Sequence, residues 1–278
     1  MSQQRIKRRQ RLPRGRRDHL LPQGYLAGFC DPNRGSLWVH DRQKHQWFAT
    51  GTRRVAAIRG FYDYSEGSDA DQSADDAFRA LEDEFPRVVR DLASDDYRNW
   101  ESRLEFLLRF GNMLRARSEL FRREDVESSK TGRWFRVEEV VERGPQTGLR
   151  VAPCNPGDVF LRNKAITDMR AEIAKGAGVF SDLNWCLRVS RDCADPVVTS
   201  DNAIILDGTA PTRDEAQRHP DTLFFFPISA QACLIGSPSS FGVKYDSFIP
   251  SDLRRLHSIY RHSGGRFIYS PSRIQFER

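Results

Sequence analysis

Apolar and polar residues follow three different patterns along the chain. Two short apolar stretches, at residues 36–40 and 46–49, flank a polar stretch, which predicts a β-hairpin with a short loop. In the middle of the chain apolar residues recur at helical spacing, and from Leu183 onward they form short strand-like runs separated by Asp-, Gly- and Pro-rich connections. Together these patterns predict an α+β fold with an N-terminal β-hairpin, a central helical bundle and a C-terminal, mostly antiparallel sheet with a late helix.

Three helices are expected in the central bundle. The first contains Pro86, which should kink it or start a new helix. The second runs from about Tyr97 to Glu124, and Gly111 on its apolar face would allow another element to approach closely. The third begins at Asp158 as its cap. These assignments place the helical part of the protein before the strands of the C-terminal half.

Charge divides the chain into an arm and a body. Every basic residue of the arm precedes the first acid, Asp18, and the remainder carries a net charge of −2 within a total of +6. These residues are Arg5, Lys7, Arg8, Arg9, Arg11, Arg14, Arg16 and Arg17. We expect residues 1–17 to be a disordered arm that contacts RNA or DNA phosphates without sequence preference; the alternative is a solvated tail or one that docks on an acidic protein partner.

The body, residues 18–278, is long enough for one composite α+β domain. Within it, residues 125–157 show no clear pattern except one candidate helix at 135–142, and we expect them to form a mobile insertion. No apolar run approaches the roughly 20 residues of a membrane span, and the N-terminus has no apolar signal segment. Five cysteines without CxxC spacing argue against a disulfide framework and a zinc knuckle. A cytoplasmic protein with reduced thiols and no membrane contact is expected.

No strong catalytic motif is present: the chain lacks GxxxxGK[ST], GxGxxG after a strand, GxSxG and HExxH. Four weaker candidates remain. His19 precedes the first apolar segment, Glu82 borders the apolar stripe of the first helix, Arg115 lies near the end of the second, and Asp201 lies in a polar break between two β-branched runs. Each of the four also has a purely structural explanation. His19 would bond a backbone carbonyl, and Glu82 would be a surface acid. Arg115 would complement a helix C-terminus or pair with Glu119, and Asp201 would form an Asx-turn.

Short motifs in a fixed order give these candidates a wider context. They are His19-x-x-Pro22-x-x-Tyr25-Leu26-x-x-Phe29, Leu37-Trp38-Val39-His40-Asp41, Phe61-Tyr62, the helix around Glu82, the Arg115 region, Thr199-Ser200-Asp201-Asn202 and Phe226-Pro227-Ile228-Ser229. From about residue 18 to the C-terminus, the chain resembles the bacterial domain-of-unknown-function family DUF4238. The resemblance implies a shared fold and a shared site, but no reaction.

Two kinds of function follow from these features. If His19, Glu82, Arg115 and Asp201 converge, the chain is expected to be a nuclease-like phosphodiester hydrolase. The resemblance to the family implies a phage-defence or toxin-like setting for it. The carboxylates of Glu82 and Asp201 would hold Mg²⁺ or Mn²⁺ or take a proton. His19 would shuttle the proton, and Arg115 would stabilise the charge that develops on phosphate. The alternative is a non-catalytic nucleic-acid-binding or regulatory protein-interaction module. An exposed Phe224-Phe225-Phe226 run would support a partner surface, although a continuous apolar strand is normally buried.

Overall fold

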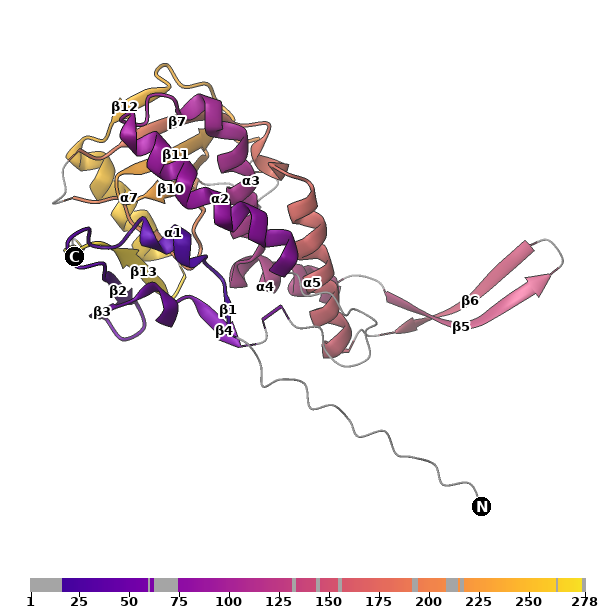
Figure 1. Ribbon diagram of the computed structural model, residues 1–278. Coiled ribbons are helices and arrows are strands. Elements are labelled where there is room, and N and C mark those ends of the chain that lie inside the picture. Colours follow the sequence, from indigo (N-terminus) through magenta and orange to yellow (C-terminus); the bar gives the residue numbers. More distant parts are fainter. Residues whose placement is uncertain are drawn as a thin grey trace.

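The computed structural model (Figure 1) describes most of the chain after the basic arm. The described residues are 17–59, 61–62, 75–131, 134–143, 146–154, 157–191, 195–208, 215, 218–263 and 265–276. The basic residues before Arg17 therefore lie outside the described part, and the predicted disorder of the arm stays a prediction. Helices and strands mix as expected for an α+β fold.

The helices follow the predicted order with three changes. Their bounds are α1 Gln23–Ala27, α2 Asp75–Ser94, α3 Leu104–Ala116, α4 Glu119–Thr131, α5 Asp158–Ala174 and α7 Pro250–Ser263, with short 3₁₀ turns at Thr52–Arg54, Trp100–Arg103 and Gly178–Phe180. Helix α2 continues through Pro86 without ending. The residue before α5 is Gly157, which makes no side-chain capping bond, so Asp158 begins this helix rather than capping it. None of the described helices has the length and apolar character needed to cross a bilayer.

The second predicted helix is two helices. A 3₁₀ turn precedes α3, and α3 and α4 are separated by Arg117 and Ser118. The hydroxyl of Ser118 accepts a hydrogen bond from the backbone N–H of Phe121 at 3.1 Å, which satisfies one of the open donors at the start of α4. The local cap therefore starts a new helix where apolar spacing alone indicated one continuous helix.

Two sheets form the C-terminal half, and one of them includes the N-terminal hairpin. The larger sheet has the order β12-β7-β11-β10-β9, antiparallel except for the β12–β7 pair; its strands are β7 Asn184–Val189, β9 Ile205–Asp207, β10 Leu223–Ser229, β11 Ala232–Ser237 and β12 Tyr245–Ser247. The smaller sheet has the order β3-β2-β13-β8, with strands β2 Leu37–Asp41, β3 Gln46–Thr50, β8 Thr199–Ser200 and β13 Phe267–Ser270. The predicted hairpin is therefore confirmed, and the last strand of the chain pairs with it.

Residues 134–143 and 146–154 form a long two-stranded ribbon that projects from the body in Figure 1. Strand β5, Trp134–Arg143, pairs antiparallel with β6, Gln146–Cys154, with one irregularity in register. The candidate helix at 135–142 is therefore wrong. Over so short a length, its Glu- and Val-rich sequence fits the period of a helix and that of a strand equally well. The pairing with β6 satisfies the backbone groups that a helix would bond internally. A further two-stranded pair, β1 Arg17–His19 with β4 Ala57–Arg59, holds the start of the body.

The apolar run on β10 is a core strand. Phe224 and Phe226 are buried in the main core, which includes residues of α2, α3 and α5, whereas Phe225 is buried on the opposite face of the sheet, in a core that includes α7. Burial on both faces explains a continuous apolar strand. Gly111 lets α3 approach closely, because a Cβ there would lie 3.0 Å from the ring of Phe226, as its position predicted. The run is therefore not a partner surface.

Candidate functional site

Asp201 lies where the chain passes from one sheet to the other. Strand β8 belongs to the smaller sheet and β9 to the larger, so the polar break between two β-branched runs is the crossover. The backbone N–H of Asn202 donates to the hydroxyl of Ser200 at 3.2 Å. The side chain that makes the local turn bond is therefore Ser200, not Asp201 as the Asx-turn alternative predicted. The side chain of Asp201 is directed to strand β13 instead.

Two groups of β13 hold the carboxyl of Asp201. Its Oδ2 accepts a hydrogen bond from the backbone N–H of Phe267 at 2.9 Å, and its Oδ1 accepts one from the hydroxyl of buried Tyr269. Gly265 allows the chain before β13 to close over this carboxyl, because a Cβ at that position would lie 2.6 Å from the Cβ of Asp201. The orientation of the Asp201 side chain therefore depends on residues more than sixty positions away in the chain.

Burial raises the pKa of Asp201 from its usual value of 3.8 to about 6. The bonds from Tyr269 and Phe267 oppose this rise in pKa, and the negative charge of Glu119 adds to it. A carboxyl group that titrates near neutral pH can hold or release a proton under physiological conditions, which an ordinary aspartate does not do.

Asp201 lines a cavity of about 760 Å³ that we call the arginine cavity. Its lining residues include four arginines, Arg42, Arg122, Arg123 and Arg266, and two acids, Glu119 and Asp201. The arginines come from three separate parts of the chain: the end of the β2–β3 hairpin, α4 and the segment before β13. The volume suits a small ligand, and the excess of guanidinium groups favours an anion.

Three of the four guanidinium groups are held by protein atoms. Arg42 donates to the carbonyl of Gly265 at 2.6 Å, Arg266 donates to the carboxylate of Asp41 at 2.9 Å, and Arg122 donates to the carbonyl of Phe61 at 3.2 Å. A guanidinium carries five N–H donors, so these bonds fix its position without using all of its donors. The cavity is therefore organised for an anionic ligand before any ligand binds.

His19 and Glu82 lie together in a different cavity, of about 420 Å³, which also includes Arg117. Arg117, only 3% exposed, forms an ion pair with Glu82, which is 30% exposed, and donates to the backbone carbonyl of His19. Its Nε donates to the hydroxyl of Tyr62 at 2.6 Å, and its guanidinium lies 4.4 Å from the ring centroid of Phe78. The Glu82 carboxylate therefore has a fixed cation, and the partner is Arg117 rather than Arg115.

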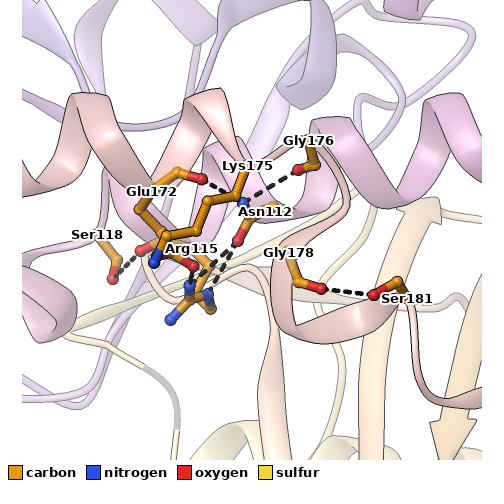
Figure 2. A network of polar contacts seen from close by, with 8 residues as sticks. All are labelled: Asn112, Arg115, Ser118, Glu172, Lys175, Gly176, Gly178 and Ser181. Atoms are coloured by element: carbon orange, nitrogen blue, oxygen red, sulfur yellow. Dashed lines mark hydrogen bonds and ion pairs between the residues drawn. The ribbon is translucent and has the colours of Figure 1, made fainter.

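Arg115 lies in neither cavity, because it is buried between α3 and α5. Figure 2 shows its guanidinium beside Asn112 and Glu172. It forms an ion pair with Glu172 and donates to Oδ1 of Asn112 at 3.1 Å, while Nδ2 of Asn112 donates to the carbonyls of Glu172 and Gly176. These contacts join two helices. Arg115 lies in the last turn of α3, as the helix-end alternative predicted, but its ion-pair partner is Glu172 rather than Glu119.

The structure therefore separates the four residues expected to converge. His19 and Glu82 share one cavity, Asp201 lines another, and Arg115 lines neither. Sequence reasoning missed the basic lining of the arginine cavity. The sequence signal for it is weak, because these arginines are far apart in the chain and only the fold brings the hairpin, α4 and the start of β13 to one place. Within the described part of the chain, no three or more His, Cys, Asp or Glu side chains gather as potential metal ligands.

Comparison with models of known protein families matches residues 17–272 to the family described as protein of unknown function (DUF4238). The match covers most of the chain, and the chain belongs to this family, as its motifs indicated. No curated protein and no solved structure matches the chain. The family description assigns no reaction, so the function has to be argued from the cavities themselves.

Proposed function

We propose that the protein binds the phosphodiester backbone of nucleic acid in the arginine cavity and hydrolyses it there. The observation that carries this proposal is the position of Asp201: a carboxyl group with a pKa of about 6 lines a cavity that also holds four arginines. The arginines match the charge of a phosphate and of the more highly charged transition state. Asp201 supplies a group that exchanges a proton near neutral pH.

The two carboxyl groups of the cavity divide the proton transfers between them. The carboxylate of Glu119 accepts a proton from the attacking water, whose oxygen forms the new bond to phosphorus. Protonated Asp201 donates its proton to the leaving oxygen as the other P–O bond breaks, and solvent then restores both groups. One water is consumed, and the phosphodiester becomes a phosphomonoester and an alcohol. The arginines stabilise the negative charge at phosphorus throughout.

The experiment that tests this proposal is cleavage of labelled RNA and DNA, followed on a gel from about pH 5 to about pH 8. It includes Mg²⁺, Mn²⁺ and chelator arms, because carboxylate oxygens are also the ligands that these ions prefer. We expect cleavage that declines as the pH rises through 6, where Asp201 loses its proton, and that is lost in Asp201→Asn. Asp207→Asn is the matched control, since Asp207 is paired with Arg255 at 2.7 Å outside the cavity.

Two results would contradict the proposal. Full cleavage by folded Asp201→Asn would remove this residue from the reaction. A wild-type protein that cleaves neither RNA nor DNA under any of these conditions would refute hydrolysis as the function. Circular dichroism and the thermal midpoint of each variant establish that a loss of cleavage is not a loss of folding.

Binding without cleavage is the second candidate function, and one observation favours it. Both carboxylate oxygens of Asp201 already accept hydrogen bonds from β13, as expected of a residue that holds a sheet together. In that case the arginines alone act, and affinity should fall steeply with salt because phosphate contacts release counterions. Binding by wild-type protein that persists in Asp201→Asn and falls in Arg123→Ala, with no cleavage, would select this function.

A further inference from the structure

A second basic cavity, of about 400 Å³, lies along α7 and is called here the α7 cavity. Four of its lining residues share one face of α7, because Arg254, Ser258 and His262 follow one another at a spacing of four and Arg261 comes three positions after Ser258. None of the described residues that line it is acidic. Arg254 lies in the first half of α7 and Arg261 in its last turn, so cations line the cavity along most of the helix.

An aromatic platform forms one wall of the α7 cavity. Phe276, which lines the cavity, stacks on Trp47 of β3 with ring centroids 5.9 Å apart and an interplanar angle of 12°. Both rings are partly exposed. The guanidinium of Arg261 lies 5.8 Å from the centroid of Phe276, and the ring of buried His40 lies 5.1 Å from it, centroid to centroid. A supported aromatic ring beside cations is the arrangement that stacks a nucleobase and neutralises its phosphate.

Arg42 links the linings of the α7 cavity and the arginine cavity. Arg42, which lines the arginine cavity, donates to the carbonyl of Gly265 at 2.6 Å and to the carbonyl of His262 at 3.1 Å. Gly265 lines the arginine cavity and His262 lines the α7 cavity. The Arg42 guanidinium is therefore bonded to one residue of each cavity, which makes the two linings neighbours.

We propose that the α7 cavity binds a nucleotide of a single-stranded nucleic acid whose neighbouring phosphodiester lies in the arginine cavity. The base stacks on Phe276, and Arg254 and Arg261 contact its phosphates. A single strand is required because a base inside a helical duplex is stacked on its neighbours and cannot enter a cavity. This inference rests on the proposed function, since it names the substrate class of the same site and adds a subsite to it.

The test is binding of fluorescent single-stranded RNA and DNA to the full chain carrying Asp201→Asn, which keeps the strand intact. In this background, Arg254→Ala with Arg261→Ala should weaken binding about tenfold and reduce the salt dependence by about two phosphate contacts. Phe276→Leu keeps the apolar bulk but removes the ring, and should weaken binding at least fivefold, because base stacking on an aromatic ring contributes about 1–3 kcal/mol. Arg255→Ala on the same helix is the matched control, since Arg255 is paired with Asp207 outside the cavity.

Cleavage by the otherwise wild-type chain separates this inference from the proposed function. If a long strand is cleaved and the α7 variants neither weaken its binding nor raise its KM, the α7 subsite is refuted while hydrolysis stands. If no cleavage occurs but binding depends on Arg254, Arg261 and Phe276, hydrolysis is refuted and the subsite stands. Equal affinity for duplex and single strand, or stronger binding of a poly-glutamate peptide that the same variants weaken, would overturn the inference.

Discussion

Asp201→Asn should change how the stability of the protein depends on pH. The folded protein binds the Asp201 proton with a pKa of about 6, whereas an unfolded aspartate has its usual value of 3.8. The group therefore adds stability below pH 3.8, and this stability is lost as the pH rises through 6. This difference between the folded and unfolded pKa corresponds to about 3 kcal/mol of stability, of which about 2 kcal/mol is lost between about pH 4.5 and about pH 7.

Asparagine has almost the same shape as aspartate and does not titrate. Its carbonyl can accept from the N–H of Phe267, and its amide can donate to the hydroxyl oxygen of Tyr269, so the contacts to β13 are retained. Urea unfolding followed by tryptophan fluorescence at a series of pH values measures both proteins. We expect the stability of Asp201→Asn relative to wild type to rise by about 2 kcal/mol between about pH 4.5 and about pH 7. Asp207→Asn controls for the loss of one carboxylate, and a difference between wild type and Asp201→Asn that stays constant with pH would refute the reasoning.

Three further predictions concern packing, and urea unfolding measures each. Glu172→Ala leaves the guanidinium of Arg115 buried without its counter-ion and should cost about 3–5 kcal/mol; a loss below 1 kcal/mol would mean that the pair is solvated. Gly111→Ala places a methyl group 3.0 Å from Phe226 and should cost about 1–3 kcal/mol, and an unchanged midpoint would contradict the close approach of α3. Tyr25→Phe removes a buried hydroxyl that bonds two buried partners and should cost about 1–3 kcal/mol, whereas a neutral effect would show that water replaces it.

The sequence indicated an arginine near the end of the second predicted helix as a site residue, but not which of Arg115 and Arg117 pairs with Glu82. Two positions on a helix differ by about 200° in direction, so the two side chains face opposite neighbours. Arg115 faces α5 and pairs with Glu172, whereas Arg117, just after α3, reaches Glu82 on α2. Which helices pack on which side of α3 is a property of the fold, and the pattern of charges along the chain does not contain it.

Local pattern determined much of this protein by itself. It identified the β2–β3 hairpin, the C-terminal sheet and the burial of the β10 run, because each depends on apolar periodicity over a few residues. It failed at residues 135–142, where strand and helix periods fit equally and only the partner strand β6 decides between them. The polar break at Asp201 was recognisable as a break, since β-branched runs flank it.

The surroundings of that break depend on contacts between distant parts of the chain. The last strand, β13, returns to pair with the N-terminal hairpin and with β8, which brings Arg266 beside Arg42 and places both at the cavity that Asp201 lines. Pairings between residues more than two hundred positions apart depend on the closure of the whole sheet, not on any local preference. The same closure buries Asp201 and raises its pKa, so the chemistry of this carboxyl group follows from the fold rather than from its neighbours in the sequence.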